Sequence, residues 1–157
     1  FHKGQGALAF ATAHPELLAR CRAVLTLEHL PAREVRRGAS GYEPTGRLQP
    51  VHVYASSHPS LLAAMWRTLD DVPPPFDVAV EQPLLGLPLS DVAGYLARSK
   101  EQDSGYPGRG GVPYLSWISA PLYLVDAADT PAMVGREHLA ATVRTVTELV
   151  RRLMALP

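Results

Sequence analysis

The segment GVPYLSWISAPLYLVDAADTP, from Gly111 to Pro131, decides the fold class. Its first part, GVPYLSWIS, has the composition of a buried strand, and DAADTP is rich in turn-forming residues. The next segment, REHLAATVRTVTELVRRLMAL, has a helical period with one apolar face formed by Leu139, Val143, Val146, Leu149, Val150 and Leu153. A buried strand followed by a long amphipathic helix that packs on the sheet is typical of an α/β domain.

Strand and helix patterns alternate along the rest of the chain. Strands are predicted over residues 23–30 (AVLTLEHL), 51–56 (VHVYAS) and 76–80 (FDVAV), and helices on either side of Pro15 and over 57–71 and 90–100. The stretch 32–49 has turn formers and no steady period, so we expect a surface loop there. The pattern predicts one α/β domain over residues 1–157, a three-layer sandwich with a central mixed, largely parallel sheet.

Charge and hydropathy argue against two classes of partner. The 157 residues carry 15 basic and 15 acidic side chains, so the chain has no net field that would attract nucleic acid. The longest apolar stretches, such as 83–89, are far shorter than the ~20 residues that a membrane span needs. We therefore expect neither nucleic acid nor a membrane as a partner, and the compartment stays open.

Common self-contained catalytic motifs are absent from the sequence, including HExxH, CxxC and GxSxG. Glu28 and His29 lie at the carboxyl end of the predicted buried strand 23–30, where open α/β sheets hold ligands and metals. Adjacent strand residues point to opposite faces, so at most one of the two can face a given site. Glu28 is a candidate site residue or a structural ion-pair partner, and His29 is expected to be structural.

A second group of carboxylates surrounds the last predicted strand. It contains Asp103 in DSGYPGRGGVP and Asp126 and Asp129 in DAADTP. An Asp-Thr-Pro sequence also forms ordinary turns that side-chain hydrogen bonds hold together. Spacing alone does not decide between a turn and a site.

Taken in order, these motifs resemble the carboxy-terminal half of the zinc-dependent aminopeptidase family, which includes bacterial leucyl aminopeptidases, glutamate carboxypeptidases and glutaminyl cyclases. Glu28 in LTLEHL matches the acidic metal ligand at a strand end, and Asp103 precedes Gly111 as the family's aspartate precedes its Gly-Val-Pro strand. DAADTP matches the family's Asp-Thr turn. The resemblance implies a zinc-exopeptidase-like fold with Glu28 as a metal ligand, and with Asp103, Tyr123, Val125 and Asp129 near the metal or in the pocket.

The chain departs from the family at one important position. Val125 lies four residues before Asp129, where the family has a metal-binding histidine, and valine cannot bind zinc. The family's other histidine, its bridging aspartate and its general-base glutamate would precede Phe1. The resemblance therefore implies an incomplete domain that binds zinc only in the complete protein and not tightly by itself.

Two functional hypotheses follow from the resemblance. In the first, the chain is a fragment or subunit of a metallohydrolase that cleaves peptide or amide bonds, takes peptide or aminoacyl substrates and associates with an amino-terminal portion. In the second, it is a non-catalytic relative that acts as a binding or assembly module. A third interpretation is a generic α/β domain whose likeness to the family arose by chance.

Overall fold

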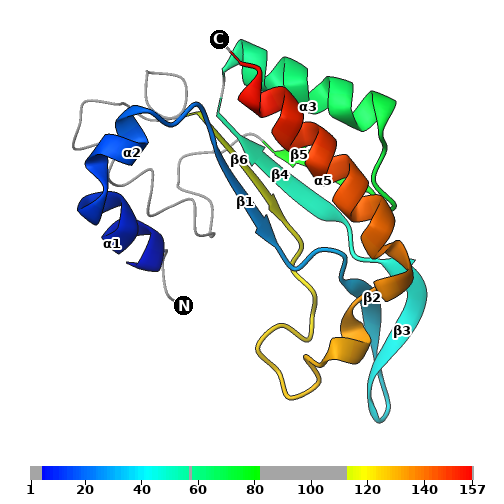
Figure 1. Cartoon of the computed structure of the whole chain (residues 1–157). Coiled ribbons are helices and arrows are strands. Elements are labelled where there is room, and N and C mark those ends of the chain that lie inside the picture. Colours follow the sequence, from blue (N-terminus) through cyan, green and yellow to red (C-terminus); the bar gives the residue numbers. More distant parts are fainter. Residues whose placement is uncertain (1–4, 57, 82–112, 157) are drawn as a thin grey trace.

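The computed structural model describes residues 5–56, 58–81 and 113–156. It shows a mixed α/β fold with a mostly parallel four-stranded sheet and a small antiparallel sheet (Figure 1). The strands are β1 (Val24–Glu28), β2 (Arg33–Gly38), β3 (Gly41–Leu48), β4 (Val51–Ala55), β5 (Val78–Glu81) and β6 (Tyr114–Ile118). The helices are α1 (Gln5–Ala13), α2 (Pro15–Ala19), α3 (Pro59–Asp71) and α5 (Leu139–Met154), with 3-10 turns η1 (Pro131–Met133) and η2 (Arg136–His138).

The larger sheet has the strand order β1-β6-β4-β5. β1 runs parallel to β6, β6 runs antiparallel to β4, and β4 runs parallel to β5. These strands confirm the α/β class and the four strands that periodicity predicts. The helix predicted over residues 90–100 lies outside the described residues.

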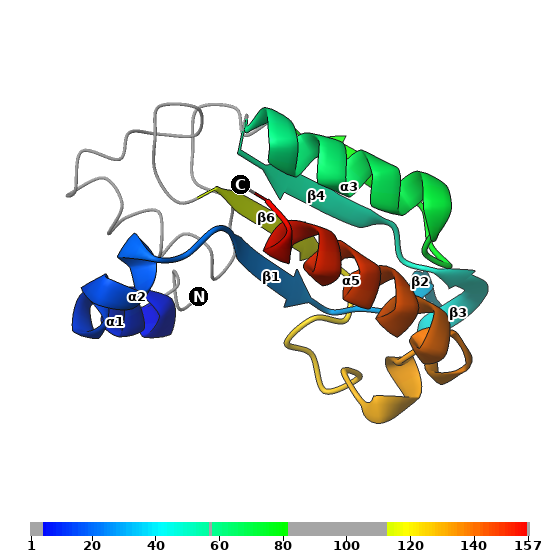
Figure 2. The same cartoon turned by 45° about the horizontal axis from the view of Figure 1, so that its top comes forward.

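The core lies between this sheet and the helices α3 and α5, which pack side by side on one of its faces (Figures 1 and 2). Leu61 and Met65 of α3 and Leu149 of α5 are completely buried against Val53 and Trp117 of the sheet. Pro59 begins α3. Backbone N–H groups in the first turn have no hydrogen-bond partner within the helix, so proline loses no bond there. The same rule explains why Pro15 ends α1 and opens α2, as the sequence predicts.

The stretch 32–49 is not a loop, and that prediction was wrong. It forms the hairpin β2–β3, whose strands pair antiparallel with Arg36 opposite Glu43. The pair is joined by an ion pair of 3.2 Å, and Thr45 donates a hydrogen bond of 2.6 Å to Glu34 across the hairpin. Because most of the hairpin is exposed, its strands lack the apolar alternation that reveals a half-buried strand.

The apolar face predicted for α5 is also partly wrong. Leu149 is buried, but Val143 is 58% exposed. Thr142 and Thr145 lie in the buried positions instead, and each hydroxyl donates a hydrogen bond to a carbonyl one turn earlier in the helix. These bonds satisfy both hydroxyls without partners elsewhere, so the threonines can pack inward while larger apolar side chains face outward.

Membrane crossing would need a long apolar helix. None of the helices in the described ranges is long and apolar enough to span a bilayer.

Replacing one leucine tests the assignment of the buried face of α5. Leu149→Ala should lower the free energy of unfolding by about 2–5 kcal/mol, because it leaves a cavity in the core. Val150→Ala, at the adjacent exposed position, should lower it by less than about 1 kcal/mol. Urea unfolding followed by tryptophan fluorescence measures both values, and equal losses would contradict the assignment.

Candidate functional site

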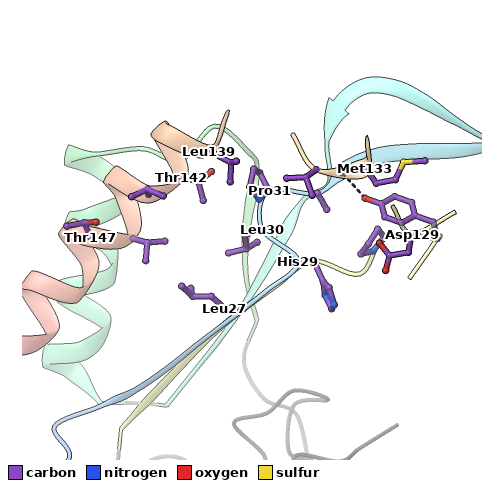
Figure 3. Close-up of a pocket in the computed structure, with 15 residues that line it drawn as sticks. Leu27, His29, Leu30, Pro31, Asp129, Met133, Leu139, Thr142 and Thr147 are labelled. Atoms are coloured by element: carbon purple, nitrogen blue, oxygen red, sulfur yellow. Dashed lines mark hydrogen bonds between the residues drawn. The ribbon is translucent and has the colours of Figure 1, made fainter. Parts of the chain in front are cut away.

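An open groove with a volume of about 450 Å³ lies beyond the end of β1 (Figure 3). It is bounded by the first half of α5, by the chain segment that follows β1, and by the loop after β6. Its walls are mainly apolar, with a few hydroxyl, imidazole and carboxylate groups. The lining residues are Leu27, His29, Leu30, Pro31, Ala32, Pro121, Tyr123, Asp129, Met133, Val134, Leu139, Thr142, Val143, Val146 and Thr147.

At His29 the chain turns away from β1, and this residue lines the groove. Its backbone has a left-handed φ of 58°, so the chain turns immediately after Glu28. Ser119 at the end of β6 donates its hydroxyl to the carbonyl of His29 at 2.6 Å, and Nδ1 of His29 lies 3.0 Å from the carbonyl of Ser119. Since a carbonyl only accepts, Nδ1 carries a proton, and in this tautomer Nε2 is an acceptor.

Tyr123 anchors the loop that forms the far wall of the groove. Its ring is almost completely buried. Its hydroxyl lies 3.1 Å from the carbonyl of Arg33 and 3.3 Å from the carbonyl of Met133, and donates to them. One side chain thus joins the loop to the start of β2 and to η1, which keeps the groove wall in place.

The environment of Tyr123 favours its neutral form. Burial raises the pKa of the phenol above 10.0, and the negative charge of Asp129 raises that pKa further. The positive charge of Arg33 opposes both effects. Asp129 therefore acts electrostatically on Tyr123 while its own carboxylate is exposed at the groove.

The loop between β6 and η1 carries the other residues that the resemblance marks. Val125 is 86% exposed and has a left-handed φ of 61°. Asp126 accepts a hydrogen bond of 2.9 Å from the backbone N–H of Ala128, an arrangement typical of an Asx turn. Val125 does not line the groove, whereas Asp129, four residues later, does.

Glu28 is half-buried at the end of β1 and does not line the groove. Because side chains alternate along a strand, Leu27 lies on the groove side and Glu28 points to the opposite face. Glu28 and His52 are both paired with Ile118, one on each side of β6. They therefore share that opposite face of the sheet, and sequence alone had left the orientation of His52 open.

The structure thus brings together only some of the residues that the sequence marks. Tyr123 and Asp129 meet at the groove, Glu28 and Val125 lie elsewhere, and Asp103 is outside the described residues. Sequence reasoning assigned His29 a structural role and did not foresee that it also lines the groove. It also missed the part of α5 that forms a groove wall, because the helical period predicts that this face is buried.

The donor groups of the described residues do not fit a catalytic zinc, which needs three protein ligands and an open position. Within residues 5–56, 58–81 and 113–156, no three His, Cys, Asp or Glu side chains gather so that they could hold a metal ion. Val125 offers no donor atom where the resemblance places a histidine.

Comparison with known proteins finds no matching family model, no similar curated protein and no similar solved structure. The geometry of the groove is therefore the main guide to function.

The link between Asp129 and Tyr123 can be measured directly. Asp129→Asn should lower the pKa of Tyr123, because it removes a negative charge that disfavours the phenolate. Because the pKa of Tyr123 is higher in the folded protein than in the unfolded chain, the unfolded chain loses this proton at a lower pH. The free energy of unfolding should therefore fall as the pH rises above about 10. Titration of the tyrosine ring carbons by NMR gives the pKa.

Asp126→Asn is the matched control for this titration. Asp126 lies in the same loop and does not contribute to the raised pKa of Tyr123. If both variants shift the pKa of Tyr123 equally, the proposed effect of Asp129 is wrong.

Proposed function

We propose that the groove binds the apolar side chain of a peptide or aminoacyl ligand. In this proposal the chain is the substrate-binding part of a three-layer, zinc-exopeptidase-like domain. The observation that carries the proposal is an apolar groove of about 450 Å³ with an exposed carboxylate, Asp129, among its lining residues. Such a volume falls in the ~300–1,000 Å³ range that is typical of small-molecule sites.

The apolar part of the groove suits an aliphatic or aromatic side chain. Leu27, Val143 and Val146 present branched apolar side chains from two different elements. Burying a leucine-sized side chain there would contribute roughly 1.5–3 kcal/mol before the costs of binding. This contribution favours residues such as leucine over glycine.

The polar groups suit the backbone of the same ligand. Asp129 has no ion-pair partner among the described residues, so its carboxylate can bind an α-ammonium group. His29 lines the same groove, and its Nε2 can accept a hydrogen bond from an amide N–H. An amine and an amide beside an apolar side chain describe the amino-terminal residue of a peptide or an aminoacyl amide.

Leucine amide is a suitable probe for this proposal. Val143→Ser should weaken its binding about fivefold, which corresponds to roughly 1 kcal/mol of lost apolar contact. Val150→Ser, on the same helix but outside the groove, should leave the dissociation constant unchanged. Isothermal titration calorimetry measures both constants, with glycinamide as a ligand that lacks the side chain.

The charged contact has its own controls. Asp129→Asn should weaken the binding of leucine amide but not of N-acetylleucine amide, which carries no positive charge. Asp126→Asn should leave the dissociation constants of both ligands unchanged. Equal affinity of the unmodified protein for leucine amide and glycinamide would refute the proposal.

A second candidate function is hydrolysis by a complete zinc enzyme, which the position of Glu28 at the carboxyl end of β1 favours. Zinc would polarise the scissile carbonyl in such an enzyme. The described residues do not fit the metal, so the other ligands would have to come from an amino-terminal portion.

Metal content separates the two functions. If the second holds, the protein expressed from its complete gene should contain stoichiometric zinc that Glu28→Ala removes and Glu16→Ala, at an exposed position of α2, retains. A folded, metal-free protein that does not hydrolyse leucyl amides would rule out the hydrolase.

A further inference from the structure

The loop that carries Asp129 consists of overlapping tight turns. Three backbone hydrogen bonds of 2.9 to 3.0 Å close turns from Pro121 to Leu124, from Tyr123 to Asp126 and from Asp126 to Asp129. Each turn shares residues with the next, so a shift of the first turn also moves the Asp129 carboxylate. A contact that holds the first turn therefore affects the groove, even when it lies outside the groove.

Burial does not hold the outer side of this loop. Leu122 is 56% exposed and Val125 is 86% exposed, whereas Tyr123 is buried. Segments with few buried apolar contacts are the ones that open most easily in a folded protein. The first turn therefore depends on hydrogen bonds to the rest of the molecule.

Tyr42 of β3 provides such a bond. Its hydroxyl donates to the carbonyl of Leu122 at 3.2 Å. Its ring meets the ring of Tyr123 edge-on, with the ring centres 6.3 Å apart and the planes at 70°, which is a favourable aromatic geometry. Tyr42 does not line the groove. It contacts the loop from the hairpin, which lies beside the loop in both views (Figures 1 and 2).

The hairpin is also attached to the segment that follows the loop. Ala32, just before β2, forms a β-bridge with Val134. Arg33 donates a hydrogen bond of 2.9 Å to Glu137 of η2. The base of the hairpin thus holds the chain after the loop, and Tyr42 holds the first turn of the loop.

We propose that Tyr42 is a positioning residue that makes the groove specific for a positively charged amino group. This role rests on the proposed function, in which Asp129 binds the α-ammonium group of the ligand. A charge-assisted hydrogen bond needs its two groups about 2.7–2.9 Å apart, and a mobile loop loses conformational freedom when a ligand fixes it. By holding the first turn, Tyr42 keeps the carboxylate at the groove before the ligand binds.

Replacing Tyr42 by phenylalanine removes the hydroxyl and keeps the ring contact with Tyr123. Tyr42→Phe should weaken the binding of leucine amide about threefold, because the loop must then be ordered on binding. It should leave the dissociation constant of N-acetylleucine amide unchanged, because that ligand does not use Asp129. Isothermal titration calorimetry measures both constants.

Tyr54→Phe is the matched control for the loss of a phenolic hydroxyl. Tyr54 alternates along β4 with Val53 and Ala55, which are buried in the core, so it lies on the face of the sheet away from α5. Its replacement should change neither dissociation constant. If Tyr42→Phe weakens leucine amide and N-acetylleucine amide by the same factor, its role is merely structural and the proposal is overturned.

A double-mutant cycle tests the positioning of Asp129 without any ligand. The negative charge of Asp129 contributes to the raised pKa of Tyr123, so that pKa reports how close the carboxylate lies. Tyr42→Phe should lower the pKa of Tyr123 more in the unmodified background than in the Asp129→Asn variant. Comparing the two backgrounds cancels the direct effect of removing the Tyr42 phenol. Titration of the tyrosine ring carbons by NMR gives each pKa.

The two experiments separate failure of the proposed function from failure of the role of Tyr42. If the unmodified protein binds leucine amide no better than glycinamide, the proposed function fails and the specificity assigned to Tyr42 fails with it. If leucine amide binds selectively but Tyr42→Phe changes the pKa of Tyr123 equally in both backgrounds, the proposed function stands and Tyr42 does not position Asp129.

Discussion

The parallel pairing of β1 with β6 and the hydrogen bonds that close its end determine where the groove forms. Ser119 binds the ends of both strands, with its N–H on the carbonyl of Glu28 and its hydroxyl on the carbonyl of His29. These bonds hold His29 in its left-handed conformation, so the chain leaves β1 toward the hairpin. The loop after Ser119 starts from the same point, which places the two walls of the groove opposite each other.

The helix α5 connects the core to the surfaces that carry function. Thr142 and Thr145 satisfy their hydroxyls within the helix, and Leu149 and Leu153 pack on the sheet. Other apolar side chains of the helix, Leu139, Val143 and Val146, form one wall of the groove. Contiguous exposed apolar surface of this kind marks binding sites for ligands or partners.

Periodicity in the sequence predicts the elements that bury one apolar face. It does not predict elements that are mostly exposed or turns that depend on a single backbone conformation. Periodicity finds β1, β4, β6, α3 and α5, because each packs an apolar face on the core. It misses the β2–β3 hairpin, whose register depends on contacts such as Arg36–Glu43 between exposed side chains. It does not place His29 at the groove, because strand alternation does not predict a left-handed residue that turns the chain there. The positions of Tyr123 and Asp129 at the groove follow from the loop anchored by Tyr123, and their roles toward a ligand stay predictions.

The location of the binding site is the most direct test of this account. Leucine amide can be titrated into ¹⁵N-labelled protein while the backbone amide resonances are followed. The account predicts saturable shifts at His29, Asp129 and Val143, on the two walls of the groove. Shifts confined to Glu28 and His52, on the opposite face of the sheet, would contradict it, as would the absence of any saturable shift.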